Sequence, residues 1–148
     1  MAEIILSNRM QALTDMVTPG TVITDVGCDH GFVSVYLVQK GISPRVIAMD
    51  VRSGPLEHAR EHIREYGLED RIETRLSDGL HSLKTGEAAG MICAGMGGPL
   101  MEKILTEGRE QAKGFRELIL QPQSEIPHFR TFLMEEGYLL MDENIIYE

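Results

Sequence analysis

Residues 21–31 read Thr21-Val22-Ile23-Thr24-Asp25-Val26-Gly27-Cys28-Asp29-His30-Gly31, and this stretch decides the fold. Its first six residues are mostly β-branched and predict a short buried strand. Gly27 to Gly31 predicts a turn, and the apolar segment from Phe32 to Lys40 predicts a helix directly after it. A strand, a glycine turn and a helix in this order begin a βαβ unit, which predicts a parallel sheet.

The same alternation continues toward both ends of the chain. Before the stretch, apolar residues at helical spacing predict a helix over 3–17, which Pro19-Gly20 ends. After it, the pattern predicts helices that begin near Ser53, after Gly98 and at Ile126, and strands at 45–50, 71–76, 90–94, 118–121 and 138–147. Residues 1–148 therefore form one predicted α/β domain, with a doubly wound, mostly parallel sheet and helices on both faces.

The composition limits what the chain can do. Its 148 residues are 43% hydrophobic, which suits one domain with a packed core. The net charge of −9 argues against a surface built wholly for nucleic acid, although a local basic patch or a further segment can supply phosphate contacts. The N-terminus has no signal-peptide pattern, and no apolar run reaches the ~20 residues of a membrane span. We therefore expect a cytoplasmic protein without membrane contact.

The cysteines and histidines show no metal-binding pattern. Cys28 and Cys93 are isolated thiols and are expected to be reduced. His58 and His62 lie four residues apart, among the charged neighbours that are typical of a solvated helix face. The sequence therefore predicts no metal site.

The first predicted turn carries two acids where a dinucleotide would place its pyrophosphate. Ligands of doubly wound sheets bind at the carboxyl ends of the strands, and dinucleotide sites there use a G-x-G-x-x-G turn. Here the glycines are Gly27 and Gly31, and Asp25 and Asp29 would repel a pyrophosphate by a few kcal/mol. S-adenosylmethionine carries an ammonium and a sulfonium but no phosphate, so the acid content favours this cofactor.

Two further acids follow the next strands. Asp50 ends the second strand and can accept hydrogen bonds from both hydroxyls of a ribose. Asp78-Gly79 follows the third strand and can accept a hydrogen bond from the adenine amine. Each acid alone is an ordinary turn or cap residue. Together, at the ends of consecutive strands, they favour a ligand site.

These segments resemble one enzyme family. The stretch Asp25 to Gly31 is followed by Ala48-Met49-Asp50-Val51, Ser77-Asp78-Gly79-Leu80, Ala94-Gly95-Met96-Gly97-Gly98 and Leu120-Gln121-Pro122-Gln123, and the chain opens with Ser7-Asn8-Arg9-Met10. Together they resemble the bacterial tRNA (adenine(22)-N(1))-methyltransferases, which are class I methyltransferases with a Rossmann-like fold. The acidic loops are generic to that class, whereas Asp29-His30-Gly31 combined with Ala94 to Gly98 is more specific.

The resemblance implies S-adenosylmethionine as cofactor and tRNA as partner. It also implies a seventh strand between the fifth and the sixth, and a helical C-terminal domain that helps to hold tRNA; we expect this chain to lack both. A monomer or a weak dimer is expected. The residues expected to bind the cofactor are Asp25, Gly27, Cys28, Asp29, Gly31, Asp50, Val51, Asp78, Gly79, Ala94 and Gly95.

The turn after the fourth strand suits a ring nitrogen better than an exocyclic amine. It lacks the Asn/Asp-Pro-Pro-aromatic motif of enzymes that methylate adenine N6, and neutral adenine N1 already has an in-plane lone pair. We expect a direct in-line displacement onto N1, with catalytic contacts from Asp29, His30, Gly95 and Met96. Substrate contacts are expected from Arg9, Gly97, Gly98, Gln121 and Pro122.

Each of these substrate-side assignments has an alternative. The glycines can serve only tight packing, His30 can cap or pack locally, Arg9 can be an ordinary surface arginine, and Gln121-Pro122 can simply end a strand. The function has alternatives as well. A class I methyltransferase that acts on a small molecule, and a module that binds the cofactor without catalysis, both remain open, because a fold does not fix a substrate.

Overall fold

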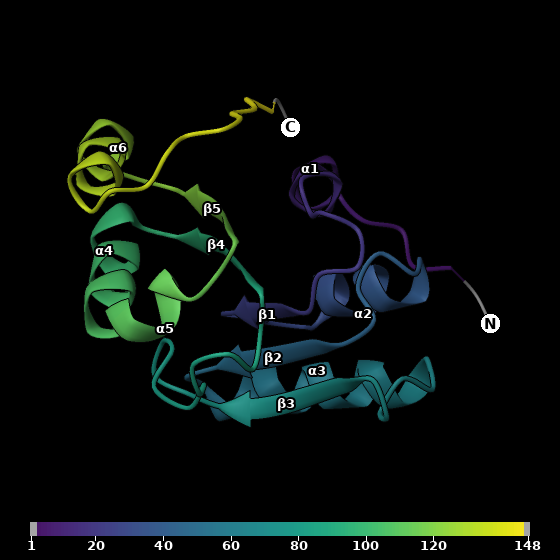
Figure 1. The fold of residues 1–148 in the computed structure, drawn as a ribbon. Helices are drawn as coiled ribbons and strands as arrows, with labels where there is room; N and C mark the ends of the chain where they lie inside the picture. The colour runs from purple at the N-terminus through teal and green to yellow at the C-terminus, as the bar shows by residue number, and fades with distance from the viewer. Residues whose placement is uncertain (1–2, 147–148) are drawn as a thin grey trace.

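The computed structural model describes residues 3–146. A parallel sheet lies at the centre of the fold (Figure 1). The strands are β1 (Ile23–Val26), β2 (Val46–Asp50), β3 (Ile72–Leu76), β4 (Gly90–Met96) and β5 (Glu117–Pro122). They hydrogen-bond in the order β3-β2-β1-β4-β5, and every pair is parallel. The chain thus builds outward from β1 in one direction and then returns to add β4 on its other side.

Helices cover both faces of this sheet, as the alternating pattern predicts. They are α1 (Asn8–Asp15), α2 (Phe32–Gln39), α3 (Ser53–Glu65), α4 (Gly98–Glu107), α5 (Arg109–Lys113) and α6 (Ile126–Glu135). The first three pack on one face and the last three on the other, and each face has its own apolar core. The short helix α5 was not predicted from the sequence.

The two cores follow from the alternation of side chains along the strands. Val46 and Ala48 of β2 belong to the core beneath α1, α2 and α3, whereas Ile47 and Met49 belong to the core beneath α4, α5 and α6. All four are buried, which explains why the strand reads as one continuous apolar run.

The first helix is shorter than the predicted span of 3–17. It begins at Asn8, because the Ser7 hydroxyl accepts a hydrogen bond from the Met10 backbone N–H at 3.3 Å and caps the helix there. It ends at Asp15. Apolar residues continue at helical spacing beyond both ends of α1, and for this reason the predicted helix was longer. Of these residues, Val17 is buried in non-helical chain, and Ile5 is exposed.

The predicted strand at 138–147 is wrong over 138–146; residue 147 lies outside the described residues. The segment has no regular secondary structure. Tyr138 and Leu140 pack against the second core, but Leu139 and Met141 are exposed. A strand needs a neighbouring backbone to accept and donate its hydrogen bonds, and the described sheet ends at β5 with no strand between β5 and this segment.

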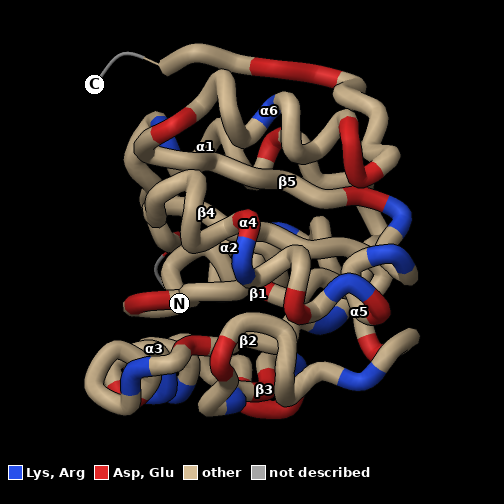
Figure 2. The backbone as a smooth tube through the Cα atoms, turned by 90° about the vertical axis from the view of Figure 1, so that its left-hand side faces the viewer, with Lys and Arg blue, Asp and Glu red and all other residues tan. Residues whose placement is uncertain are grey.

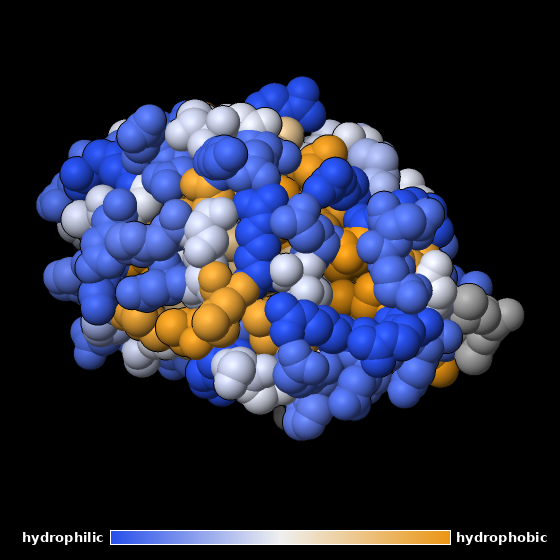
Figure 3. Space-filling view, turned by 90° about the horizontal axis from the view of Figure 1, so that it is seen from below, coloured by the Kyte–Doolittle hydropathy of each residue, from blue (hydrophilic) through white to orange (hydrophobic). Residues whose placement is uncertain are grey.

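Charged side chains protect the other edge of the sheet. Arg75 on β3 forms ion pairs with Glu73, at 2.6 Å between Nε and Oε2, and with Glu87. Figure 3 looks at the side of the molecule where β3 and α3 lie and shows mostly hydrophilic side chains, with apolar atoms exposed between them. Charges on an edge strand disfavour pairing with other chains. Among the described residues, no helix has the length and apolar character that a bilayer crossing requires.

Candidate active site

A cavity of about 550 Å³ opens at the carboxyl ends of β1, β2, β3 and β4. The cavity lies where the strand order reverses, because β1 is placed between β2 and β4. The crossover from β1 to β2 runs over one face of the sheet, and the crossover from β4 to β5 runs over the other. Four carboxylates line the cavity, those of Asp25, Asp29, Asp50 and Asp78. The sequence placed these acids at consecutive strand ends, and the structure brings them together.

The structure also locates the other predicted site residues. All residues expected to bind the cofactor or to act in catalysis line the cavity except Gly31, and Arg9 lines it as well. Gly31 instead directly precedes α2 and lies against α3, where a Cβ would meet the Cβ of Ala59 at 3.1 Å. The predicted substrate residues that do not line the cavity are Gly97, Gly98, Gln121 and Pro122.

Asp50 is the most firmly held of the four acids. Its side chain is only 1% exposed. The carboxylate accepts hydrogen bonds from the backbone N–H of Asp29 at 3.1 Å and from that of Arg52 at 3.0 Å, and the Arg52 guanidinium lies 3.2 Å away. The Arg52 side chain is 63% exposed, so this ion pair is screened by solvent and easily opened. Asp50 thus ties the loop after β1 to the loop after β2.

Asp25 lies deeper, and its charge is poorly compensated. Burial, with the nearby charges of Asp50 and Asp29, raises the pKa of Asp25 to about 6 from an ordinary 3.8. The Ser34 hydroxyl donates a hydrogen bond at 2.8 Å to its carboxylate and opposes this rise only in part. A buried carboxylate among other carboxylates favours a cationic ligand.

This raised pKa makes stability depend on pH in a defined direction. The native chain holds the Asp25 proton up to about pH 6, whereas the unfolded chain releases it near pH 3.8, so stability from this group falls as the pH rises between these values. The difference corresponds to roughly 3 kcal/mol. We expect Asp25→Asn to raise the free energy of unfolding at pH 7.5 by up to this amount, with a smaller gain at pH 4.5. Urea unfolding of both proteins measures it, and equal gains at the two pH values would contradict the assignment.

Cys28 forms part of the cavity floor and is unreactive. Burial, with the negative charge of Asp25 as the next contribution, raises the pKa of the Cys28 thiol far above its ordinary value. The backbone N–H groups of Gly27 and Cys28 both donate to the carbonyl of Met49, at 2.8 and 2.9 Å. The turn is therefore anchored to β2 through its backbone.

The loop after β4 is anchored by a residue from β5. β4 continues through Met96, beyond the predicted end at Ala94, with an irregularity in its pairing at Gly95. The Gln121 side-chain oxygen accepts hydrogen bonds from the Gly95 backbone N–H at 3.0 Å and from Arg9 at 3.2 Å. Gln121 therefore holds Gly95 and Arg9 in place from behind the cavity wall.

Gly97 and Gly98 serve packing in this structure. The backbone N–H of Gly98 donates to the Ser124 carbonyl at 3.1 Å and is therefore not free to meet a substrate. A Cβ at Gly98 would lie 2.6 Å from the same carbonyl, and a Cβ at Gly97 would lie 2.8 Å from the Ser124 hydroxyl. The two glycines allow the loop after β5 to cross the start of α4.

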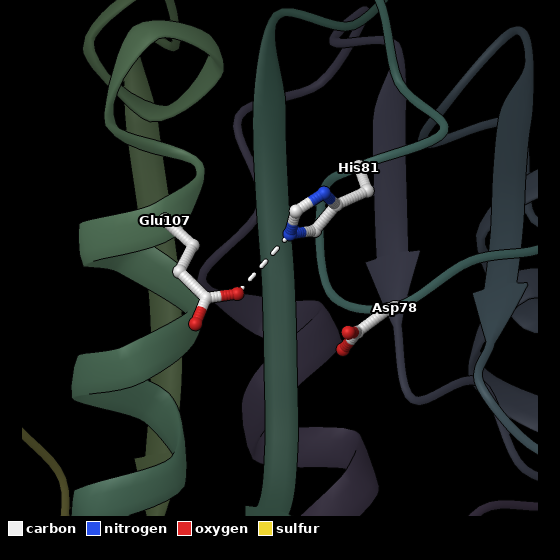
Figure 4. A group of neighbouring side chains, drawn as sticks. All are labelled: Asp78, His81 and Glu107. Atoms are coloured by element: carbon white, nitrogen blue, oxygen red, sulfur yellow. Dashed lines mark hydrogen bonds and ion pairs between the residues drawn. The ribbon is translucent and has the colours of Figure 1, made fainter.

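Asp78 also belongs to a second group of polar side chains, shown in Figure 4 with His81 and Glu107. The His81 ring and the Glu107 carboxylate are 3.1 Å apart, and one donor atom from each of the three residues lies within 4.8 Å of the others. All three side chains are exposed, and exposed acidic groups commonly gather without a metal ion. We assign no metal to this group.

The apolar wall of the cavity was not identified from the sequence. It includes Met10 and Leu13 of α1, Val33 of α2, and Leu100 and Ile104 of α4. Such residues carry the same signal as core residues, so only the three-dimensional arrangement distinguishes them. Arg52 was missed as well, although its place two residues after Asp50 was a usable signal.

His58 is exposed and His62 partly exposed on α3, as expected of a solvated helix face, but both also contact rings from outside α3. The His58 ring stacks on that of His30 with centroids 5.2 Å apart and planes 6° from parallel. The His62 ring stacks on Phe32 at 4.7 Å. These four rings form a cluster beside the cavity, and we refer to it below as the ring cluster.

Comparisons with known proteins agree with this geometry. A family model described as a methyltransferase domain matches residues 6–148. The tRNA (adenine(22)-N(1))-methyltransferase of Bacillus subtilis is 37% identical over 148 residues, which are 100% of this chain and 62% of that protein. The chain thus spans less than two thirds of the length of this relative.

Solved structures show the same fold. The B. subtilis tRNA methyltransferase TrmK superposes with a TM-score of 0.94 at 37% identity, over 99% of this chain and 62% of that chain. Streptococcus pneumoniae Sp1610 in complex with S-adenosyl-L-methionine gives 0.94 at 32% identity, over 97% and 68%. M. capricolum TrmK in complex with S-adenosyl-homocysteine gives 0.88 at 27% identity, over 97% and 63%. The resemblance read from the sequence is confirmed, and the chain belongs to the methyltransferase domain family.

Proposed function

We propose that this chain transfers a methyl group from S-adenosylmethionine to N1 of adenine 22 in tRNA. The observation that carries the proposal is the cavity itself, in which four carboxylates from the carboxyl ends of β1, β2 and β3 meet at the sheet switch point beside Gly95 and Met96. The substrate is inferred from relatives that are named as tRNA (adenine(22)-N(1))-methyltransferases.

The residues of the cavity fit this cofactor. Asp25, buried and surrounded by like charge, suits the cationic methionine end and would repel a phosphate. Asp50 can accept both ribose hydroxyls once Arg52 moves aside, and the exposed Asp78 can accept the adenine amine. The apolar wall from α1 and α4 gives the adenine ring and the aliphatic chain a dry surface.

The cofactor supplies a methyl group on a cationic sulfur, and the chain positions the acceptor nitrogen. Asp29 and His30 stand at the mouth of the cavity, with side chains 56% and 46% exposed and their nearest polar atoms 3.9 Å apart. Asp29 is held in place because its backbone N–H donates to Asp50. Methylated adenine gains a positive charge, so a fixed carboxylate at this mouth stabilises the charge that develops there.

No proton has to leave adenine N1 before it attacks. The chain therefore needs orientation rather than a strong base, and the backbone around Gly95, fixed by Gln121, forms one wall against which a flat base can be placed. We assign Gln121 to positioning rather than to direct substrate contact, since its side-chain oxygen is already used twice.

The charges of this chain bear on how tRNA is held. The net charge is −9, and Figure 2 shows Lys and Arg positions interspersed with Asp and Glu positions. Phosphate binding needs several gathered cations. We therefore propose that this chain supplies the cofactor site and the mouth at which the base reacts, and that most phosphate contacts lie outside it.

Methyl transfer to an unmodified bacterial tRNA transcript tests the function. Labelled S-adenosylmethionine, digestion and nucleoside analysis should reveal 1-methyladenosine, and a transcript with guanosine at position 22 should give none. The assay is run on this chain and on a chimera that adds the remaining part of the B. subtilis relative. Calorimetry should show S-adenosylhomocysteine binding far more tightly than NAD. If both proteins bind S-adenosylhomocysteine yet neither forms 1-methyladenosine, the tRNA assignment fails.

A further inference from the structure

We propose that the ring cluster of His30, Phe32, His58 and His62 binds an unpaired base of the RNA substrate next to the base that is methylated. The proposal rests on the proposed function for the identity of the RNA. Its own evidence is the geometry of the cluster, its position beside the cavity and the charge around it.

The ring cluster lines a groove of about 400 Å³ together with Glu61. His30 lies in the turn before α2, and Phe32 is the first residue of α2. The two other histidines lie one turn apart on α3, which runs beside α2 in Figure 1. His30 and Phe32 are stacked at 5.7 Å, with planes 23° apart. Four rings, one from the turn before α2 and three from the helices α2 and α3, thus surround one shallow groove.

This groove continues the cavity at the proposed reaction site. His30 and Phe32 line both hollows, and Asp29 stands next to His30 at the mouth. A base that is drawn out of an RNA fold to reach the cofactor brings its neighbouring nucleotides with it. A nucleotide next to the reacting base would therefore contact the ring cluster.

The cluster is poorly suited to a metal ion. Imidazole nitrogens bind metals along the plane of the ring, and the nearly parallel planes of His30 and His58 keep their lone pairs from converging on one point. The Nδ1 atom of His62 is 2.8 Å from the His30 carbonyl oxygen and is therefore engaged. The cluster therefore presents ring faces and edges for packing, rather than a set of nitrogen atoms that could coordinate one metal ion.

Flat aromatic ligands suit such a groove. Single-stranded RNA is recognised by bases that stack on Phe, Tyr, Trp or His side chains. Neither lysine nor arginine lines the groove within the described residues, and Glu61 does, so the groove disfavours a phosphate. The Glu61 carboxylate can accept a hydrogen bond from an exocyclic amine, which favours adenine, cytosine or guanine over uracil.

His58→Ala tests the proposal, because His58 lies outside the cavity and its ring is exposed on α3. We expect the KM for tRNA to rise about 5- to 100-fold, the range that loss of one stacking side chain produces. The kcat should stay within about threefold, and the affinity for S-adenosylhomocysteine should be unchanged. His58→Phe keeps a stacking ring and should restore the KM. His128→Ala, an exposed histidine on α6, is the matched control.

Direct binding separates this proposal from the proposed function. Fluorescence anisotropy with labelled oligoadenylate and oligouridylate should show weaker binding of oligoadenylate by His58→Ala and preference for oligoadenylate in the unaltered protein. If tRNA is methylated but His58→Ala changes neither the KM nor oligoadenylate binding, the ring cluster is not a base site. If oligoadenylate binding depends on His58 but no tRNA is methylated, the proposed function fails and the base site stands. If His58→Ala changes the sedimentation coefficient of the protein and leaves RNA binding unchanged, the groove serves self-association and the proposal is overturned.

Discussion

Asp50→Ala is expected to weaken the binding of S-adenosylhomocysteine by at least ~100-fold. The Asp50 carboxylate is buried, charged and aimed by two backbone N–H groups, so it can offer two charge-assisted hydrogen bonds to a ribose. Such bonds contribute roughly 1.5–3 kcal/mol each, and the loss of two corresponds to a factor of about 10² to 10⁴. The same change releases the Asp29 backbone and loosens the mouth of the cavity.

Isothermal titration calorimetry measures the effect on the folded variant, with circular dichroism to show that the fold is retained. Asp70→Ala is the control, since Asp70 is an exposed acid outside the cavity and carries the same charge change. It should leave the affinity within about twofold. An affinity of Asp50→Ala within threefold of the unaltered protein would remove Asp50 from the cofactor site.

Gly98→Ala is expected to lower the free energy of unfolding by about 2–3 kcal/mol. The added methyl group would lie 2.6 Å from the Ser124 carbonyl oxygen, which is backbone and cannot rotate away. Relief requires the loop after β5 to move, and this also stretches the hydrogen bond from the Gly98 N–H to Ser124. Overpacking of this kind typically costs 1–3 kcal/mol, and a lost hydrogen bond adds about 1 kcal/mol.

Chemical denaturation measures this loss, and Gly54→Ala provides the comparison. Gly54 lies in α3, and a Cβ there would meet nothing within 4 Å. Alanine should therefore stabilise that helix, by up to about 1 kcal/mol. Equal effects of the two substitutions would show that the crossing at Gly98 is not tight.

The fold was largely predictable because its strongest signals are local. The strands β1, β2, β4 and β5 are each marked by a short apolar run, and the turn from Gly27 to Gly31 carries its signal in adjacent residues. The acids at the strand ends could be grouped because parallel topology alone brings those ends together. The cofactor side of the site follows from these two facts.

The features that were missed depend on partners far away in the chain. β4 extends past Ala94 because Gln121, on the neighbouring strand, accepts the Gly95 N–H. The segment 138–146 has a strand-like pattern of side chains, but no described strand lies next to it. Neither fact is encoded within the segment that it affects.

The ring cluster was also missed because its members are distant from one another in the sequence. His58 and His62 looked like members of a charged helix surface because their neighbours in sequence are Glu57, Glu61 and Arg60. Their neighbours in space are His30, in the turn before α2, and Phe32, the first residue of α2. Periodicity shows which face of a helix a residue occupies, but it does not show which other element packs against that face.

The central position of β1 has a kinetic consequence. Ile23 of β1 is paired with Gly90 of β4, more than sixty residues later, so the cavity between their ends closes only when distant parts of the chain have met. A molecule held in that cavity bridges loops that are not yet assembled in earlier folding states. We therefore expect a bound molecule to slow unfolding without hastening folding, so that a supply of cofactor would lengthen the lifetime of the folded chain.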